Sequence, residues 1–301
     1  MKTKTIVVFG CTGTVGSVLM EQLSRENCQV RGVLRDSTRS YPVHINNGQT
    51  SNVSYVSANL ENPDELYRAC LSSDCVFLLT ATAPKQVIYE TNIIQAAKKA
   101  GVKRIIKLSS PQAPTIVEVS NWHKKVEDVL ESSGLEYCCL RPYAFMQNWE
   151  RNTFTMRAFG KIFGSLDNAA RNYVDCRDVA TVAVQSLLSP ESLQDKVITL
   201  TGPEAITNYD MAERFSQVTN SKIEYVNIPS DKLYNELTKK AKLPGWLAKH
   251  IIELDNLAKM IPEPTSDSTE VIINKKPRIM NAYLQESRHL FERKPLWKFW
   301  A

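Results

Sequence analysis

The first half of the chain alternates short apolar runs with segments whose apolar residues follow a helical period. In 14–26, apolar side chains recur at three- and four-residue intervals, as on one face of a helix: Val15, Val18, Leu19 and Leu23. Strands that alternate with helices are typical of βαβ units and a parallel sheet. The pattern predicts strands at 6–9, 28–34, 53–57, 75–79, 104–108 and 137–140, and helices at 14–26, 63–71, 87–100 and 119–133.

Residues at the ends of these segments support the division. Asn62 is placed to cap the helix at 63–71, and Gly101 and Gly134 follow the next two helices, where helices commonly end. The polar stretch 37–51 contains a proline and a glycine and is expected to be a loop.

After about residue 150 the alternation weakens. We expect a helix at 178–188, capped by Asp178 and with Arg177 in a nearby ion pair, and then a strand at 197–201. Further helical segments, separated by prolines, follow near 208–218, 230–241, 245–260 and 281–292.

These segments predict an α/β fold with two parts. A doubly wound parallel sheet would occupy 1–150, and the segment at about 173–200 is expected to return to it. A smaller, mainly helical C-terminal lobe over 151–301 would bind the substrate.

A glycine-rich turn joins the first predicted strand to the first helix: Gly10-Cys11-Thr12-Gly13-Thr14-Val15-Gly16. Gly10 permits the tight turn, Gly13 lets backbone N–H groups approach a pyrophosphate, and Gly16 lets the helix pack closely on the sheet. The spacing is GxxGxxG, and its place between a strand and an amphipathic helix predicts nucleotide binding. Cys11 is expected to be a small side chain in a variable slot; the alternative is a reactive thiol at a helix N-terminus.

The end of the second strand indicates which nucleotide binds. Arg35 can pair with a 2′-phosphate and favours NADP, with help from Arg39. In the alternative, Arg35 is solvated and Asp36 holds the ribose of NAD.

Six segments together resemble the NmrA-like family of atypical short-chain dehydrogenases/reductases: 10–16, 30–36, 97–110, 133–137, 140–148 and 173–180. The resemblance covers nearly the whole chain and is stronger over the first 200 residues. It implies a Rossmann domain that binds NADP(H), with the substrate cleft between this domain and a variable C-terminal lobe. Members of the family include NADPH-dependent reductases and proteins that bind the nucleotide as redox sensors.

The resemblance also implies roles for individual positions. It places the cofactor against Gly10, Thr12, Gly13, Thr14, Val15 and Gly16, with Asn59 and Leu60 beside the adenine and Thr80, Ala81 and Thr82 beside the ribose. Ser109 would end near the nicotinamide, and Asn148 would lie at the cleft. Independently of the resemblance, Tyr143, at the carboxyl edge of the sheet, and Ser110 are expected to face the substrate, and Trp246, on the apolar face of its helix, is expected to line the pocket.

The catalytic pair of the classical relatives is incomplete. Those enzymes use Tyr-x-x-x-Lys on the helix after the fifth strand, where the lysine lowers the tyrosine pKa and holds the ribose. Here Lys125 is available for the ribose, but Asn121 stands four residues before it; Ser120 stands four before Lys124. Either the acceptor needs no strong acid, or Tyr143 or His123 donates the proton, or the protein binds NADP(H) without turnover.

Composition narrows the class of protein. The net charge of +5 is spread along the chain, which suits an anionic ligand and argues against nucleic acid. No apolar run is long enough for a membrane helix. Seven cysteines without a CxxC pair and four histidines without HxxxH spacing predict reduced thiols, a cytoplasmic location and no metal site. The aromatic segment 296–301 is expected to pack on its own lobe or on a second subunit of a homodimer.

The sequence therefore predicts a cytoplasmic NADP(H)-dependent reductase of a small quinone-, enone- or imine-like substrate. Two alternatives stay open: a non-catalytic NADP(H) sensor that acts through a protein partner, and an isomerase or cyclase without net redox change.

Overall fold

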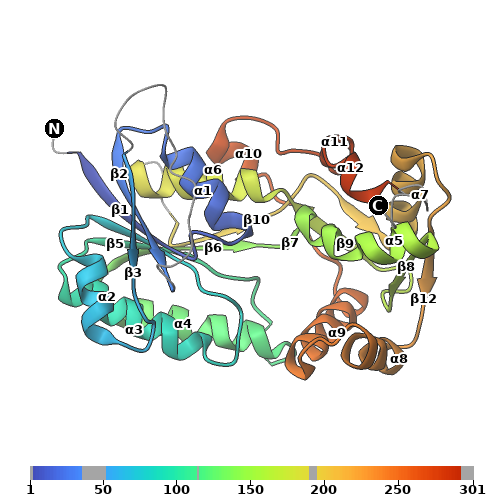
Figure 1. The fold of residues 1–301 in the computed structure, drawn as a ribbon, viewed down its shortest axis with the longest axis horizontal. Coiled ribbons are helices and arrows are strands. Elements are labelled where there is room, and N and C mark those ends of the chain that lie inside the picture. Colours follow the sequence, from blue (N-terminus) through green and yellow to red (C-terminus); the bar gives the residue numbers. More distant parts are fainter. Residues whose placement is uncertain (1–2, 36–51, 114, 190–194, 293–301) are drawn as a thin grey trace, which may run out of the picture.

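The computed structural model describes residues 3–35, 52–113, 115–189 and 195–292. Its larger part is a seven-stranded parallel sheet with the order β10-β6-β5-β4-β1-β2-β3 (Figure 1). The strands are β1 (Lys4–Phe9), β2 (Cys28–Leu34), β3 (Val53–Ser57), β4 (Cys75–Leu78), β5 (Arg104–Leu108), β6 (Glu136–Pro142) and β10 (Val197–Leu200).

Helices cover both faces of this sheet. On one face lie α1 (Thr14–Leu23) and α6 (Cys176–Leu188); on the other lie α2 (Pro63–Cys70), α3 (Gln86–Lys99) and α4 (Glu118–Ser133) (Figure 1). Successive strand residues point to opposite faces, so Ile6 and Val8 pack in one core cluster and Val7 and Phe9 in the other. Burial on both faces explains why Ile6–Phe9 of β1 and the whole of β4 are continuous apolar runs.

The second part of the molecule is built from shorter elements. Two small sheets have the orders β11-β9-β7 and β12-β8, from β7 (Ala144–Phe145), β8 (Lys161–Gly164), β9 (Ala170–Val174), β11 (Ala205–Thr207) and β12 (Glu224–Asn227). Around them lie η1 (Met146–Asn152), α5 (Thr153–Phe159), α7 (Asn208–Thr219), α8 (Ser230–Asn235), η3 (Glu236–Lys240), α9 (Gly245–Met260), α11 (Met280–Glu286) and α12 (Arg288–Phe291). Helix α10 (Ser268–Ile273) lies apart from them, against the first part.

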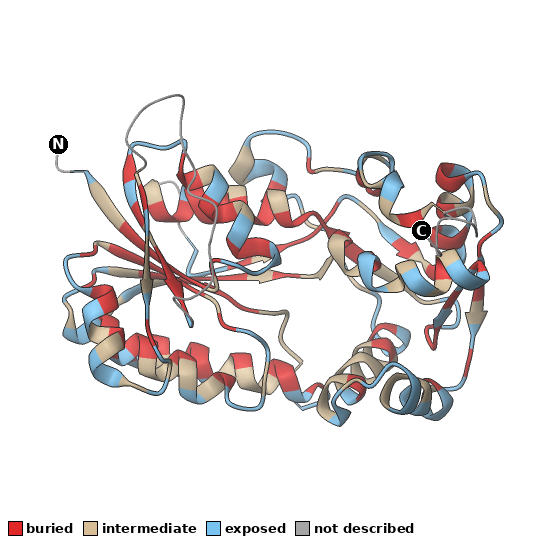
Figure 2. Ribbon diagram, viewed as in Figure 1, coloured by how far each residue is buried: buried red, intermediate tan, exposed pale blue. Residues whose placement is uncertain are grey.

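The lobe has a core of its own, and buried segments occur in both parts of the molecule (Figure 2). In the core of the lobe, Trp149 packs on Tyr173 and Phe215, and Phe215 packs on Phe291. The chain also crosses between the two parts, since β10 pairs with β6 and α10 packs against α6 and β10.

The strands and helices predicted for the first half are confirmed. Asn62 caps α2 by accepting hydrogen bonds from Asp64 and Glu65, and Gly101 and Gly134 adopt the left-handed conformation after α3 and α4. The predicted α/β fold with a doubly wound sheet is confirmed as well. The predicted loop at 37–51, the terminal segment 296–301, and Asp36 and Arg39 lie outside the described residues.

Several predictions for the second half were wrong in detail. The predicted helix at 230–241 is divided into α8 and a π-helical turn, and the one at 281–292 into α11 and α12. The short strands β8, β9, β11 and β12 and the helices α5 and α10 were not predicted.

The expected cap of α6 was also wrong. Asp175, not Asp178, is the N-cap, and its carboxylate accepts a hydrogen bond of 2.8 Å from the backbone N–H of Arg177. Arg177 pairs with this same Asp175 at 2.6 Å, so an ion pair of Arg177 is confirmed. Asp178 is fully buried in the first turn and pairs with Arg278, which connects α6 to the segment before α11.

Candidate functional site

The glycine turn after β1 leaves no room for side chains at two positions. Gly10 has a φ of +70°, and a Cβ there would lie 2.7 Å from the carbonyl oxygen of Leu79. A Cβ on Gly16 would lie 2.0 Å from the carbonyl oxygen of Gly10. The turn and the first helical turn are therefore packed so tightly that only glycine fits at either position.

The N-terminus of α1 meets the requirements of an anion site. Gly13 is the N-cap and offers no side chain to the helix, and the first turn of α1 contains no acidic residue. Its N–H groups and the positive end of the helix dipole are thus available to an anion. Thr12, Gly13 and Thr14 are exposed, whereas the Val15 side chain is buried, so Val15 can offer only its backbone. These residues fit the diphosphate of a dinucleotide.

Cys11 is a structural residue of this turn. Its side chain is buried and donates a hydrogen bond to the carbonyl oxygen of Val33 at 3.3 Å. Burial raises the pKa of the Cys11 thiol to about 11, so the thiol keeps its proton at neutral pH. This agrees with the expectation of a small packed side chain.

The residues expected beside the adenosine part lie at the ends of β2 and β3. Arg35 is exposed directly after β2. Asn59 is also exposed, but its side-chain oxygen accepts a hydrogen bond from the backbone of Glu61 at 3.0 Å. Leu60 is half-buried against the core on the α2–α3–α4 face.

A fully buried ion pair lies beneath the ends of β4 and β5. Lys107 of β5 pairs with Glu90 of α3 at 2.8 Å, and both side chains are completely inaccessible. Glu90 also accepts hydrogen bonds from the backbone and the hydroxyl of Thr80 at 3.3 and 3.0 Å. Thr80 is thus fixed by the pair, while Ala81 and Thr82, which follow it, are exposed at the edge of the sheet.

His123 belongs to the same buried network. Its Nδ1 lies 3.3 Å from the ammonium group of Lys107 and 3.3 Å from the amide nitrogen of Gln86. Burial, with the charge of Lys107 as a second cause, lowers the pKa of His123 well below its ordinary value. The imidazole is therefore neutral at pH 7 and carries no extra proton to donate.

A second buried carboxylate accepts a hydrogen bond from the hydroxyl of Ser109. This hydroxyl donates a hydrogen bond of 2.6 Å to Glu127 of α4, which also binds Arg141 of β6 through two nitrogens. Ser109 is therefore a partner of the Glu127–Arg141 pair, and Ser110, which is half-buried, is the next hydroxyl along this loop.

The structure does not bring Lys125 to Ser109. Lys125 is exposed, while His123 on the same helix is buried. Positions two residues apart in an α-helix differ by about 200° in direction, so Lys125 lies on the opposite side of α4 from the buried network. Its neighbour Lys124 is also at the surface and pairs with Asp128.

The substrate-facing candidates Tyr143, Asn148 and Trp246 come from three separate segments of the chain. Tyr143 follows β6, and its backbone N–H donates to Leu200 at 3.0 Å. Burial and the charge of Glu263 raise the pKa of Tyr143, so the phenol is protonated at neutral pH. Asn148 is half-buried in η1, and the ring of Trp246 on α9 lies 5.8 Å from that of Trp122 on α4.

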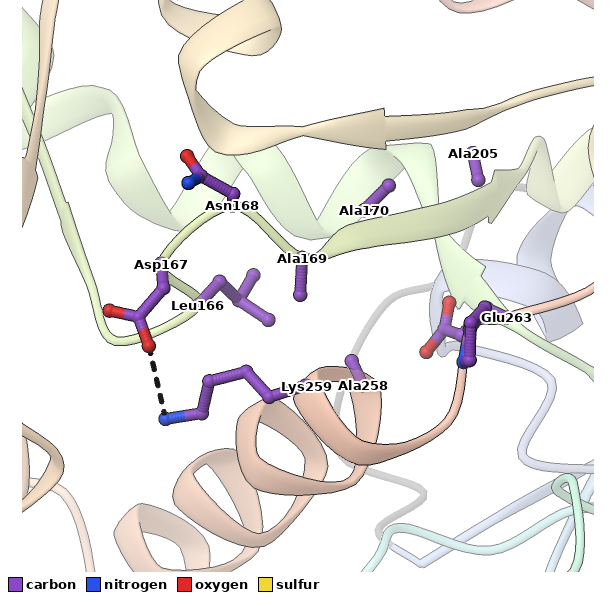
Figure 3. Close-up of a pocket in the computed structure, with 10 residues that line it drawn as sticks. Leu166, Asp167, Asn168, Ala169, Ala170, Ala205, Ala258, Lys259 and Glu263 are labelled. Atoms are coloured by element: carbon purple, nitrogen blue, oxygen red, sulfur yellow. Dashed lines mark ion pairs between the residues drawn. The ribbon is translucent and has the colours of Figure 1, made fainter.

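Glu263 also lines a recess in the C-terminal lobe (Figure 3). The recess has a volume of about 440 Å³ and lies between the loop before β9 and the end of α9. Its walls include the small side chains of Ala169, Ala170, Ala205 and Ala258. A loose ion pair of 3.8 Å between Lys259 and Asp167 closes one end of it (Figure 3).

Among the described residues, no group of three His, Cys, Asp or Glu side chains is placed to hold a metal ion, and none of the helices there is long and apolar enough to cross a membrane.

A model of the NmrA-like family matches residues 2–284 of this sequence. The chain belongs to the NmrA-like family. It is 28% identical over 257 residues to an NAD(P)H azoreductase of Xenophilus azovorans. The matched region covers 84% of this chain and 87% of the azoreductase.

Two solved structures share the fold of this NmrA-like chain. An NADPH-dependent quinone oxidoreductase of Escherichia coli, complexed with NADPH, has a TM-score of 0.81 at 20% identity. This match covers 95% of this chain and 100% of the quinone oxidoreductase. A triphenylmethane reductase of Citrobacter sp., complexed with NADP(H), has a TM-score of 0.75 at 16% identity. This match covers 94% of this chain and 99% of the triphenylmethane reductase.

Sequence reasoning missed four charged residues of this NmrA-like protein: Glu90, Lys107, Glu127 and Arg141. The one usable signal was the lysine within the otherwise apolar strand Arg104–Leu108. A lysine on a strand that is buried on both faces needs a partner, and such a partner can come only from a helix packed on the sheet.

Proposed function

We propose that this chain is an NADP(H)-dependent oxidoreductase that reduces a small quinone-, enone- or imine-like organic substrate. The observation that carries the proposal is the N-terminus of α1, which has no side-chain cap and no acid in its first turn and is framed by glycines that admit no Cβ. An NAD(P)H azoreductase among the relatives supports a reductase.

In this proposal the chain holds the dinucleotide along the sheet edge. Gly10, Gly13 and Gly16 form the turn beneath the diphosphate, with the exposed hydroxyls of Thr12 and Thr14 beside it. The exposed guanidinium of Arg35 takes the 2′-phosphate. Asn59, Leu60 and the segment Thr80, Ala81 and Thr82 border the nucleoside parts.

When bound, the nicotinamide supplies a hydride, which brings two electrons and one hydrogen to the acceptor. The acceptor also needs one proton. Tyr143 suits this role better than His123 or Ser109, because the phenol is protonated and half-buried at the edge of the sheet. His123 is neutral and enclosed, and the hydroxyl of Ser109 already donates to Glu127. The exposed position of Lys125 gives little support to its role at the ribose.

The test is acceptor-dependent oxidation of NADPH by the purified protein, with quinones, enones and imines as acceptors. Loss of nicotinamide absorbance that depends on both protein and acceptor supports the reductase. Tight NADPH binding without turnover of any acceptor would instead support a sensor, and product formation without net oxidation of NADPH an isomerase or cyclase.

The preference for NADP has a separate test. Arg35→Ala is expected to weaken NADPH binding about tenfold or more, since a charge-assisted contact contributes about 1.5–3 kcal/mol, and to leave NADH binding nearly unchanged. Arg25→Ala is the matched control, because Arg25 is exposed just after the C-terminal end of α1 and pairs with Glu21. Equal losses for both nucleotides would remove Arg35 from the phosphate site.

A further inference from the structure

Gln112 carries two buried polar atoms that have no hydrogen-bond partner in the described chain. Both its amide nitrogen and its amide oxygen are enclosed and unpaired. Buried amides are rarely left in this state, because they lose their hydrogen bonds to water and gain none in return. Gln112 lies two residues after Ser110, in the loop that leaves β5 at the carboxyl edge of the sheet.

The backbone on both sides of Gln112 is held firmly. The hydroxyl of Ser120 donates to the carbonyl oxygen of Pro111 at 3.0 Å and accepts from the N–H of Ala113 at 2.8 Å. Ser120 belongs to the first turn of α4, so the position of Gln112 is fixed relative to the start of that helix.

Helix α9 meets the start of α4 at this same place (Figure 1). Lys249 pairs with Glu118 at 2.9 Å, and Glu253 accepts a hydrogen bond of 3.0 Å from the backbone of Glu118. The rings of Trp122 and Trp246 complete the contact. We call these residues the α4–α9 junction.

His250 lies on the side of α9 that faces the junction. Positions at three- and four-residue intervals share one helix face, and this face contains Trp246, Lys249, His250 and Glu253. The Nδ1 of His250 is buried and has no partner among the described residues. Burial, and then the charges of Arg171 and Arg151, lower the pKa of His250 to about 4, so the ring is neutral at pH 7.

We propose that Gln112 and His250 recognise a carbonyl oxygen of the acceptor, which makes a neutral quinone- or enone-like carbonyl compound the substrate class. This inference rests on the proposed reductase function. The unpaired amide N–H of Gln112 donates to the carbonyl oxygen, and the neutral imidazole of His250 donates a second hydrogen bond in its Nδ1–H tautomer. An iminium cation without an N–H offers no lone pair to these donors and no proton to the amide oxygen of Gln112, and would leave all three unpaired.

The same amide stabilises the product of hydride addition. As the hydride reaches a conjugated carbonyl compound, negative charge develops on the oxygen before the proton arrives. A fixed N–H donor favours this charge more than the neutral carbonyl, and therefore contributes to rate as well as to binding.

Entry of the acceptor requires the junction to open. Among the described residues, the contacts of α9 with α4 include an exposed ion pair, one backbone hydrogen bond and one tilted ring pair. Exposed ion pairs stabilise little, so the junction can open at small cost to admit a flat molecule, with α9 moving together with the lobe to which its Asp255 is bound through Ser165 and Arg171.

The experiment compares Gln112→Leu with wild-type protein on two acceptors, 1,4-naphthoquinone and a cationic triarylmethane dye that has no carbonyl group. We expect kcat/KM for the quinone to fall about tenfold or more, and kcat/KM for the dye to change less than about twofold. His250→Phe, which keeps a ring and removes both nitrogens, should show the same selectivity with a smaller loss. The control is Gln95→Leu, because Gln95 is exposed on α3.

Two further readouts separate recognition from a structural role. The NADPH affinity should be unchanged in Gln112→Leu, and its melting temperature should not fall, because the substitution removes two unpaired polar atoms from a buried place. A lower melting temperature with equal losses on both acceptors would overturn the proposal.

Measurements on the wild-type protein alone already distinguish the carbonyl inference from the proposed reductase function. Turnover of the dye but not of the quinone overturns the carbonyl inference and leaves the reductase in place. Turnover of no acceptor at all, with NADPH bound, overturns both.

Discussion

Charged groups are treated differently beneath the large sheet and at the α4–α9 junction. Beneath the large sheet, Lys107 and Glu90 are completely enclosed, and Glu127 is nearly so. At the junction, Lys249 and Glu118 expose 57% and 46% of their side-chain surface.

This difference indicates which of the two regions is held in one arrangement before a ligand binds. Buried charges tolerate only one arrangement, since any movement leaves an ion without its partner, so they fix Thr80 and Ser109 at the cofactor edge. Exposed pairs can separate into water at little cost, which allows the junction to adapt to an acceptor. Experiments can test this contrast, beginning with the cofactor turn, which is the glycine turn at 10–16.

The largest effect is expected at Gly16. In Gly16→Ala the new methyl group would lie 2.0 Å from the carbonyl oxygen of Gly10, so the turn and the helix must separate. We expect NADPH affinity to fall roughly hundredfold, because several backbone contacts of about 1 kcal/mol each are displaced together. Titration of the cofactor by fluorescence measures this.

Gly101→Ala is the matched control for that substitution. Gly101 has a positive φ, of +77°, which Gly16 does not, and no neighbouring atom lies within 4 Å of the position of its Cβ. The Gly101→Ala variant should lose about 1 kcal/mol of stability through backbone strain and keep its NADPH affinity unchanged. Similar losses of affinity in both variants would mean that lower stability, and not contact with the cofactor turn, decides.

The next effect is expected at the buried pair. Lys107→Met leaves the carboxylate of Glu90 buried without its cation, and we expect the free energy of unfolding to fall by about 3–5 kcal/mol. Chemical denaturation measures this change. The double variant Lys107→Met with Glu90→Gln should recover part of the loss, because it removes the uncompensated charge as well. No recovery would show that Lys107 acts through packing and not through its charge.

The strands differ in how well the sequence predicts them. Strands β1, β2, β4, β5 and β6 are buried on both faces and read as apolar runs. In the lobe, β9, β11 and β12 have only three to five residues, with polar and apolar residues mixed, as in ARNYV, AIT and EYVN. Such strands exist because of tertiary pairing, which no local pattern records.

The candidate site divides in a similar way. The glycine turn could be placed, since its chemistry depends on neighbouring positions of the chain. The partners of Lys107 and Ser109 could not, because Glu90 and Glu127 come from helices whose rotation about their axes the sequence leaves open. The same ambiguity affects Lys125 and His123, two positions apart, of which only His123 is turned inward.

A smaller effect is expected from the pH dependence of stability in the lobe. The pKa of His250 is lowered to about 4 in the folded protein, against an ordinary value of 6.5. The unfolded chain therefore takes up a proton at a pH where the folded chain does not. Stability is lost as the pH falls from about 6.5 to about 4, by about 2–3 kcal/mol from this residue.

His250→Gln should remove that part of the pH dependence. The measurement is the free energy of unfolding at pH 7 and pH 4.5 for both proteins, since His123 contributes in the same direction to each and cancels in the comparison. An unchanged difference between the two pH values would show that His250 is accessible to protons in the folded state.

The smallest effect is expected at the α4–α9 junction itself. Lys249→Ala removes the exposed pair with Glu118, and Lys124→Ala removes an equally exposed pair with Asp128 within α4. Both should shift Tm by less than about 2 °C, because such pairs stabilise little. Only the pair of Lys249 connects the two parts of the molecule, so only Lys249→Ala should change the KM for the acceptor, by about two- to threefold, while NADPH affinity stays constant in both. If Lys124→Ala changed this KM as much, the response would come from surface charge and not from the freedom of the junction, and the contrast between a fixed cofactor edge and an adaptable junction would lose its support.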